Sequence, residues 1–474
     1  MPLHDPLYVE APSRTHDPHR ILLVSCYELG QEPLSLTVPA GILARAGIAA
    51  RLLDLAVSPL DLDAVACAEL VAISAPMHTA LRLGRALATI VRRVNPECHV
   101  CFFGLYAGLN EAHLVPALAD SCFGAEFEAP LLALAQQVDL ARVRGVRPRD
   151  AAPPSSTPTR ERSPGRALDM TPLRDGLVNR ERYAKLALGN ERIEVGTVTT
   201  TRGCKHLCRH CPLPPAYAGS FYALPVARIL DDVAAVVGRG ARHIDFADAD
   251  FLNGPTHALR VAREMTRRFP GLTFNYTAKI EHLQAHVDVV AELHDLGNLF
   301  IVSAVESFND AVLAALAKGH TRADALAVTR RLRAQGLVLR PTFVPFTPWE
   351  TRASYAELFD IVEGEGLVEH VDPVQYSIRL LVPEGSLLLA AAEMQPHLGA
   401  FHAETLSYAW AHPDASMDEL QRAIARAASA WDAVTEPHEV AFARLRALLD
   451  SACRSGGRPG KPGRVPRLTE DWFC

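Results

Sequence analysis

Residues 199–211 read Thr-Thr-Thr-Arg-Gly-Cys-Lys-His-Leu-Cys-Arg-His-Cys, with Cys204, Cys208 and Cys211 inside eight positions. They follow a stretch at 194–200 that predicts a β-strand. Three thiolates in one short loop can hold an iron–sulfur cubane and leave one of its irons without a protein ligand. The alternative is a zinc site with His206 or His210 as fourth ligand. Structural zinc usually pairs two short turns, so the position of this loop directly after a strand favours the cluster.

The elements that follow this loop indicate the fold. We predict strands at 194–200, 243–247, 273–276, 300–304, 338–344 and 374–378, and helices at about 225–238, 256–268, 284–296, 309–335 and 351–365. Six β units joined by helices are typical of a partial (β/α)6 barrel, here over residues 167–386. Chemistry in such barrels lies at the C-terminal ends of the strands, where the three cysteines are expected. Residues 387–452 then read as a helical region, and residues 453–474 as a flexible tail that contains cysteine.

Upstream of the loop, short apolar runs alternate with helical periods. Strands are predicted at 21–24, 52–54, 70–74 and 99–103, and helices at about 38–46 and 80–94. Continuous apolar strands between helices indicate a parallel sheet that is covered on both faces. We therefore predict an α/β, doubly wound, Rossmann-like domain over residues 19–138. A polar tail at 1–18 precedes it, and a Pro/Arg-rich linker at 139–166 follows it.

Composition excludes several classes of function. The 474 residues carry 48 basic and 54 acidic side chains, which gives no electrostatic footprint for nucleic acid or an anionic membrane. No run of 18 apolar residues predicts a transmembrane helix, and the polar N-terminus lacks the apolar core of a signal peptide. The ten cysteines are too scattered for a disulfide scaffold. We therefore expect a cytoplasmic protein with no membrane partner.

Polar side chains follow the ends of the later predicted strands. Asp248 and Asp250 follow the second strand, and Ser303 and Glu306 end the fourth. An ammonium group needs acceptors such as these carboxylates, and an ionised Glu after an apolar run is rarely buried without a partner. The alternative for the two aspartates is that they are solvated acids that cap the helix beginning near residue 256.

Two arginines lie within predicted apolar strands, Arg340 on the fifth and Arg379 on the sixth. Such cations need partners, so they either clamp a carboxylate of a ligand or form internal salt bridges with Glu306 or Asp248. Asn275 and Lys279, at the end of the third strand, are weaker candidates that could also be residues that begin a helix.

The cysteine motif and the predicted barrel resemble the radical S-adenosylmethionine (SAM) superfamily over about residues 190–385. The resemblance implies a [4Fe–4S] cluster on the three cysteines and reductive cleavage of SAM to a 5′-deoxyadenosyl radical, which abstracts hydrogen from an unidentified small-molecule or peptide substrate. It also implies an electron donor such as flavodoxin or ferredoxin. The SAM contacts that it implies are His210 near the adenine, Asp248 and Asp250 at the amino group, and Ser303 and Glu306 at the ribose or methionine. Arg340 and Arg379 are further candidates, for the carboxylate of SAM or of a substrate acid.

The N-terminal half resembles the cobalamin-binding-type Rossmann domain of some radical SAM enzymes. In that group the loops at 25–32, 74–79 and 104–110 would hold the corrin. The Asp-x-His-x-x-Gly motif for a lower cobalt ligand is absent, since His78 and His113 lack its spacing. Bound cobalamin would change the expected outcome to methyl transfer or a rearrangement. The rival from another class is a non-catalytic iron–sulfur or zinc protein with a redox or scaffold role.

More narrowly, several segments resemble the radical SAM family named for a Cys-Sec-Ala-Glu-Pro or Cys-Cys-Ala-Glu-Pro tail. These segments are 202–212, 248–254, 303–307 with 318–321, 344–349 and 372–383. In that family the tail continues beyond the first Cys. The resemblance therefore implies that this sequence was cut at Cys474 by a selenocysteine codon and that Cys474 belongs to a redox pair carried by a flexible tether. The alternative is a genuine end at which Trp472 and Phe473 pack on the barrel and Cys474 is inert.

Overall fold

The computed structural model describes residues 20–143, 171–431, 436–449 and 465–470. The predicted tail at 1–18, most of the 139–166 linker, Cys453 and Cys474 lie outside the described residues. The chain divides into two compact units, residues 1–183 and 184–474. Each unit is described by itself.

The first unit is built on a parallel sheet with the strand order β2-β1-β3-β4-β5. The strands are β1 (Ile21–Ser25), β2 (Arg51–Asp54), β3 (Leu70–Ser74), β4 (His99–Phe103) and β5 (Ser121–Phe123). Every residue of β1, β3 and β4 is buried, which explains their continuous apolar runs. The strand order reverses between β1 and β3, and ligands bind at such a switch point in doubly wound sheets.

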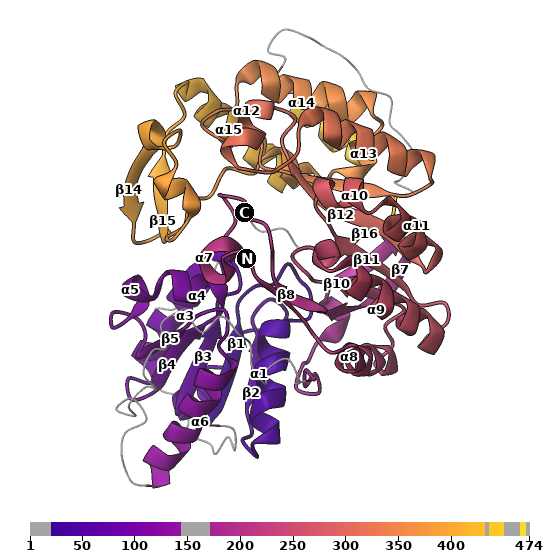
Figure 1. The fold of residues 1–474 in the computed structure, drawn as a ribbon. Coiled ribbons are helices and arrows are strands. Elements are labelled where there is room, and N and C mark those ends of the chain that lie inside the picture. Colours follow the sequence, from indigo (N-terminus) through magenta and orange to yellow (C-terminus); the bar gives the residue numbers. More distant parts are fainter. Residues whose placement is uncertain (1–19, 144–170, 432–435, 450–464, 471–474) are drawn as a thin grey trace. The chain divides into compact units, whose positions relative to one another are not determined.

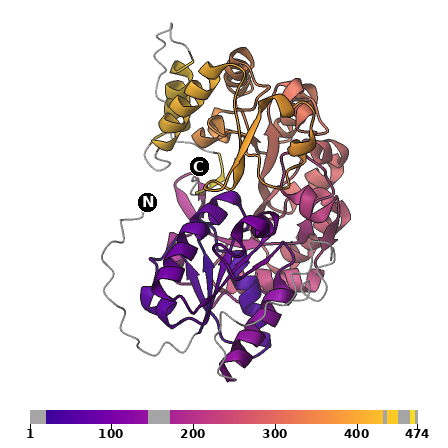
Figure 2. The same ribbon diagram turned by 90° about the vertical axis from the view of Figure 1, so that its left-hand side faces the viewer.

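Helices cover this sheet in two groups (Figures 1 and 2). One group contains α1 (Leu34–Arg45) and α6 (Glu128–Val143), which pack together. The other contains α2 (Leu62–Cys67), α3 (His78–Val94), α4 (Leu105–Leu109) and α5 (Glu111–Leu114). The predicted doubly wound domain is confirmed. Strand β5 and helices α2, α4, α5 and α6 were not predicted individually.

The second unit contains a seven-stranded sheet with the order β13-β12-β11-β10-β7-β6-β16. Its parallel strands are β7 (Glu191–Val198), β10 (His243–Phe246), β11 (Thr273–Thr277), β12 (Asn298–Glu306) and β13 (Leu339–Phe343). At one edge β6 (Lys185–Leu188) and β16 (Arg467–Leu468) add antiparallel strands that the sequence did not predict. The sheet curls into a half-barrel (Figure 1), which confirms the predicted partial barrel.

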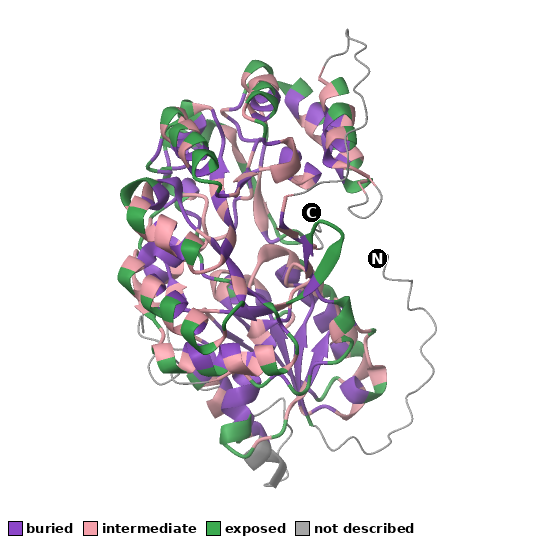
Figure 3. Cartoon of the chain, turned by 90° about the vertical axis from the view of Figure 1, so that its right-hand side faces the viewer, coloured by how far each residue is buried: buried purple, intermediate pink, exposed green. Residues whose placement is uncertain are grey.

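Helices join the parallel strands along the outside of the half-barrel (Figure 1). They are α8 (Val226–Gly238), α9 (Pro255–Arg268), α10 (Ile280–Ala285), α11 (Val287–Asp295), α12 (Asp310–Ala315), α13 (Arg322–Ala334) and α14 (Arg352–Gly364). Figure 3 shows buried strands inside helices whose outer faces are exposed. Phe246, Phe251, Phe274 and Tyr276, all buried, pack ring against ring between strands and helices. No helix among the described residues is long and apolar enough to cross a membrane.

Three expectations for this unit were wrong. The sixth predicted strand, 374–378, is instead the 3-10 helix η6 (Pro373–Tyr376), and only an isolated bridge between Phe346 and Arg379 extends the sheet there. One physical reason is that Pro373 has no backbone N–H to donate to a neighbouring strand. The other is that the Phe343 amide, which would donate to a sixth strand, donates instead to the side-chain oxygen of Gln375 at 3.1 Å.

The single helix predicted at 309–335 is broken between α12 and α13, because Ala317 (φ 53°) and Gly319 (φ 78°) have left-handed backbone conformations. The region 387–452 is not wholly helical. It contains η7 (Leu387–Ala390), η8 (Gln395–His397) and a hairpin of β14 (Leu398–His402) and β15 (Ser407–Trp410) before α15 (Ala415–Ser429) and α16 (His438–Ala447). The cross-strand contact of Phe401 with Tyr408 stabilises the hairpin and overrides the helical propensity of its alanines.

Candidate active site

The three cysteines lie in the loop after β8 (Thr201–Gly203), a short strand that follows β7 and pairs with β9 (Phe221–Ala223). Gly203 (φ 77°) begins the loop, and a Cβ there would lie 2.5 Å from the Ser220 carbonyl oxygen. Only glycine therefore allows the loop to turn so close to its neighbour. As expected, the loop leaves the C-terminal end of the first barrel strand.

All three thiols are free, with Cys204 and Cys208 buried and Cys211 partly buried. Burial, together with the neighbouring Cys208 and Cys204 thiols, raises the pKa of Cys211 to about 12, while Lys318 acts in the opposite direction. Burial also raises the pKa of Cys204. Among the described residues of the second unit these are the only cysteines. A donor set of three thiols fits a cluster with one iron left open, and bound iron would displace their protons.

Asp248 anchors the strand that leads to this loop. Its buried carboxylate accepts from the backbone amides and hydroxyls of both Thr200 and Thr201, with the Thr200 amide at 3.1 Å. Burial raises the pKa of Asp248 to about 6, although these hydrogen bonds lower it. The contacts occupy the carboxylate, so Asp248 positions the cysteine loop, and its predicted role at the SAM amino group stays a prediction.

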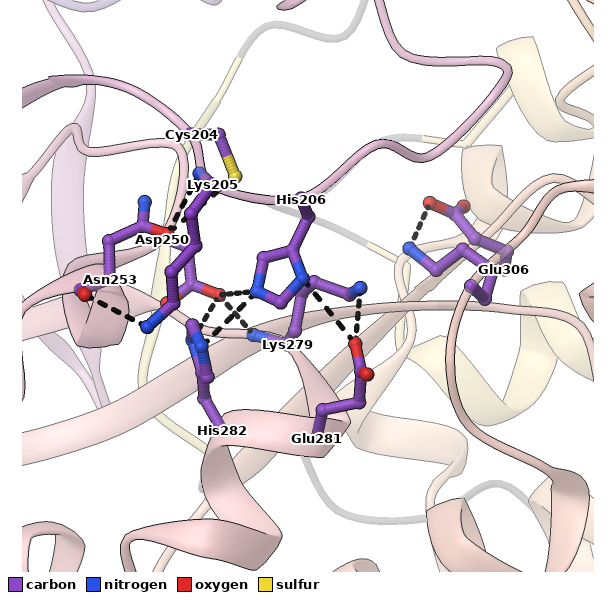
Figure 4. A network of polar contacts seen from close by, with 10 residues as sticks. Cys204, Lys205, His206, Asp250, Asn253, Lys279, Glu281, His282 and Glu306 are labelled. Carbon is purple, nitrogen blue, oxygen red and sulfur yellow. Dashed lines mark hydrogen bonds and ion pairs between the residues drawn. The ribbon is translucent and has the colours of Figure 1, made fainter. Parts of the chain in front are cut away.

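Asp250 belongs to a polar network beside Cys204 (Figure 4). One carboxylate oxygen accepts from the Leu252 amide, and the other accepts from the Lys279 amide at 3.0 Å and from His282 Nδ1 at 2.8 Å. The His282 Nε2 atom lies 3.2 Å from Nε2 of His206. Asp250 is therefore saturated by protein donors as well.

The same network reaches the first cysteine through Asn253 (Figure 4). Asn253 Oδ1 lies 3.8 Å from Cys204 Sγ and accepts from the Lys205 amide at 3.3 Å, while Lys205 Nζ donates to the Asn253 carbonyl. Two residues of the segment after β10 thus contact the cysteine loop: Asn253 contacts Cys204 and Lys205, and Asp250 lies 4.0 Å from His206. His206 faces His282, and His210 faces Glu306.

Glu306 ends β12 at a bulge and has a φ of 69°, a conformation that is strained for any residue but glycine. Its Oε1 lies 3.1 Å from His210 Nε2 and 3.2 Å from Lys318 Nζ, and all three side chains are buried or nearly so. Burial alone would raise the pKa of Glu306, but Lys318 and His210 lower it to about 2. Glu306 is therefore an ionised group that ties the cysteine loop to the fourth barrel strand.

The two predicted arginines pair elsewhere. Arg340 lies opposite Val302 in the sheet and binds Asp372 at 3.0 Å, whereas Glu306 lies opposite Phe343, further along the strand. Arg379 binds Asp418 at 2.5 Å and stacks on Trp410. Each forms an internal salt bridge, but not with Glu306 or Asp248 as expected, because α15 and the segment before η6 supply nearer carboxylates. No described contact brings either guanidinium to the cysteines.

The remaining weak candidates are also engaged within the protein. Asn275 donates to Asp245 at 2.6 Å and lies 2.8 Å from His243 inside the barrel. Lys279 pairs with Glu281 at the edge of the network around Asp250. The sequence did not predict His282, Glu281, Asn253 or Lys318 as site residues. Asn253 and Lys318 lie in segments that carry the family resemblance. The positions of all four after strands β10, β11 and β12 were the available signal.

Some buried polar atoms of the second unit have no hydrogen-bond partner within the protein. Among the described residues they include His210 Nδ1, Asn253 Nδ2, Tyr276 Oη and Ser303 Oγ. Buried polar groups are nearly always paired, so these atoms are available to a polar ligand. Two of them, His210 and Ser303, were predicted to contact SAM.

Comparisons with known proteins agree with this site. Residues 198–359 match the radical SAM superfamily. The tRNA-2-methylthio-N(6)-dimethylallyladenosine synthase of Shewanella baltica is 25% identical over 202 residues, which cover 40% of this chain and 42% of that protein. The chain thus spans less than half the length of this curated relative.

Two solved structures resemble the fold of most of the chain. TsrM from Kitasatospora setae, a radical SAM methyltransferase with cobalamin and a [4Fe–4S] cluster bound, has a TM-score of 0.54 at 18% identity, covering 73% of both chains. The cobalamin-dependent radical SAM enzyme OxsB, with aqua-cobalamin bound, has a TM-score of 0.60 at 14% identity, covering 85% of this chain and 66% of OxsB. At such identities the likeness concerns the fold.

The half-barrel and the three-cysteine loop define an enzyme domain of the radical SAM class. Residues 198–359 form a domain of the radical SAM superfamily, which works with a [4Fe–4S] cluster and SAM, and a Rossmann-like unit precedes the barrel in the chain. At the switch point of that unit, the buried hydroxyl of Ser25 at the end of β1 has no partner, which fits a polar ligand at this edge.

Proposed function

We propose that this protein cleaves SAM reductively to methionine and a 5′-deoxyadenosyl radical, which abstracts hydrogen from a substrate that remains unassigned. Bound to Cys204, Cys208 and Cys211, a [4Fe–4S] cluster supplies the electron that breaks the C–S bond of the sulfonium. The observation that carries the proposal is the loop of three free, largely buried thiols at the end of the first barrel strand. An electron donor such as flavodoxin or ferredoxin is part of the proposal.

The chain's own residues would hold SAM beside this loop. His210 and Ser303 offer the unpartnered atoms Nδ1 and Oγ for hydrogen bonds. Glu306 stays ionised beside them, because Lys318 and His210 lower its pKa to about 2 despite burial. A charged acceptor and two further polar side chains suit the hydroxyl, amino and adenine groups of SAM.

The test is conversion of SAM to 5′-deoxyadenosine by anaerobically reconstituted, reduced protein. Wild type should bind about four irons in one cubane, and Cys208→Ala should lose both the cluster absorbance and SAM cleavage. The matched control is Cys67→Ala, in the first unit, which should retain both. A fully active Cys208→Ala variant, or a reconstituted wild type that leaves SAM intact, would contradict the proposal and favour the alternative, a non-catalytic iron–sulfur or zinc protein.

A second candidate function, cobalamin-dependent methyl transfer or rearrangement, is supported by the Rossmann-like unit and its resemblance in fold to TsrM and OxsB. The loops after β1, β3 and β4 would hold the corrin at the switch point, near the unpartnered Ser25 hydroxyl. The discriminating product is a methylated substrate formed only when cobalamin is supplied.

We also propose membership in the family named for the Cys-Sec/Cys-Ala-Glu-Pro tail. The described segments that carry the resemblance support it: residues 248–254 contribute the Asp250 and Asn253 network, and residues 303–307 with 318–321 contribute the Glu306–Lys318 pair. The family assignment gives no substrate. Co-purification of a substrate with the cluster-loaded protein, followed by mass spectrometry, would supply the missing reaction.

A further inference from the structure

Two histidines beside the cysteine loop turn the same nitrogen toward each other. His206 comes from the loop between Cys204 and Cys208, and His282 comes from α10. Their Nε2 atoms are 3.2 Å apart, and together with Asp250 they offer three potential ligand atoms within 4.8 Å of one another (Figure 4). The imidazole of His282 is buried, whereas His206 is partly exposed.

A carboxylate lies behind each imidazole. Asp250 Oδ2 accepts from His282 Nδ1 at 2.8 Å, and Glu281 Oε2 lies 3.6 Å from His206 Nδ1. Protons on both Nδ1 atoms satisfy both carboxylates and leave two Nε2 lone pairs facing each other. If His206 Nε2 donates to His282 instead, the Nδ1 lone pair of His206 faces Glu281 Oε2, which Lys279 Nζ also binds. A cation between the two Nε2 atoms lets both rings keep an Nδ1–H toward a carboxylate.

We propose that His206 and His282 bind a divalent first-row transition metal ion such as Zn²⁺ through Nε2, separately from the cysteines. With metal–nitrogen bonds of about 2.0–2.1 Å, a 3.2 Å separation gives an angle of about 100° at the ion, which suits tetrahedral coordination. Borderline ions of this class prefer imidazole ligands, and a carboxylate that accepts the second ring N–H orients such a ligand.

Asp250 orients the His282 ring by accepting a hydrogen bond from Nδ1, and it is not a third ligand of the ion. Its Oδ2 lies 4.0 Å from His206 Nε2, so an ion bonded to both at about 2.1 Å would need them on nearly opposite sides. Two positions of a tetrahedral ion therefore remain for water or for donor atoms of a substrate, on the side where His206 is partly exposed. An ion held in this way would bind a substrate group next to the cysteine loop.

The experiment measures zinc in the full-length protein, reconstituted with iron and sulfide, dialysed against Zn²⁺ and passed through a desalting column. We expect one zinc per chain in addition to the cluster iron. Its X-ray absorption should show nitrogen or oxygen neighbours only, at about 2.0–2.1 Å, and no sulfur at about 2.3 Å. This readout separates the histidine pair from zinc that has replaced iron on the cysteines.

His282→Gln and, independently, His206→Ala should weaken zinc binding at least tenfold. His286→Gln is the matched control, because the ring of His286, four residues after His282, contacts the His282 ring but has no Nε2 partner of this kind among the described contacts. Iron content reports whether each variant folds and loads the cluster. Sulfur neighbours around zinc, no retained zinc, or unchanged zinc in both variants would overturn the proposal. A failure of SAM cleavage would leave the zinc result unaffected.

Discussion

Lys318 Nζ lies 3.2 Å from Glu306 Oε1, and neither side chain is more than a tenth exposed. Glu306 ends β12, and Lys318 follows the left-handed Ala317 in the break between α12 and α13. His210 of the cysteine loop shares the same carboxylate oxygen. The pair thus connects the cysteine loop, a barrel strand and an interhelical turn in the interior of the second unit.

Removing the lysine from this pair should destabilise the protein strongly. Lys318→Met leaves the Glu306 carboxylate buried without its lysine partner, which costs about 3–5 kcal/mol. Urea denaturation of cluster-free protein measures the change in the free energy of unfolding. The double variant Lys318→Met/Glu306→Gln should recover part of the loss, because no charge then remains buried. Unchanged stability in the single variant would contradict the buried ion pair.

Asp248 should make stability depend on pH in an identifiable window. Burial raises its pKa from 3.8 to about 6 in the folded protein. The folded state therefore keeps a proton that the unfolded state has released, so the stabilisation is full below pH 3.8 and is lost as the pH rises through 6. Between pH 4 and 7 the free energy of unfolding of wild type should fall relative to that of Asp248→Asn by up to about 3 kcal/mol. A difference that does not change with pH would show that Asp248 is ionised throughout.

Ser303 should contribute directly to SAM affinity. Its buried hydroxyl has no partner in the protein, so Ser303→Ala should remove a hydrogen bond to the ligand without exposing a protein group. A loss of about 0.5–1.5 kcal/mol corresponds to roughly two- to tenfold weaker SAM binding, measurable by calorimetry with the reconstituted protein. Ser377→Ala is the control, because the Ser377 hydroxyl donates to the Val374 carbonyl. Equal SAM affinity in Ser303→Ala and wild type would remove Ser303 from the site.

Arg340 should be needed for folding and not for SAM binding. Its ion pair with Asp372 is joined by His438 of α16 at 3.0 Å and by Arg467 of β16 at 4.0 Å. Arg340→Leu should therefore lower the free energy of unfolding by about 3–5 kcal/mol, since it breaks a buried charge network. The SAM affinity of the folded fraction should be that of wild type. If Arg340→Leu instead bound SAM more weakly while keeping wild-type stability, Arg340 would bind a carboxylate of the ligand.

Cobalamin supplied to the protein should bind in the base-off form. The first unit lacks the Asp-x-His-x-x-Gly spacing of a lower cobalt ligand. Hydroxocobalamin should therefore remain with the protein after gel filtration, and its absorbance should show no histidine coordination. Ser25→Leu, at the switch point between β1 and β3, should reduce retention, whereas Thr89→Leu, on the exposed side of α3 far from its first turn, should not. A base-on spectrum would identify a histidine ligand that the sequence spacing does not reveal.

The sequence by itself determined the class of the protein and the order of its parts. Three cysteines at fixed spacing after a strand are a local signal, because the ligands of one cluster can come from one loop. The apolar runs at β1, β3 and β4 likewise predicted a buried parallel sheet, since strands covered on both faces need apolar side chains throughout. The positions of Ser303 and Glu306 at one end of β12 were also readable from the strand pattern.

The tertiary structure alone decided which charged groups meet. Arg340 and Glu306 lie on neighbouring strands, yet the sheet register separates them, and Asp372, 32 residues further on, neutralises the arginine. His206 and His282 are 76 residues apart and come together only because the loop after β8 packs against α10. Ion pairs and ligand sets of this kind depend on distances of a few ångströms between segments remote in sequence. The hydrophobic period and the residue spacing of a sequence indicate which face of a helix or strand is buried. They do not indicate which distant residue packs against that face or pairs with its charges.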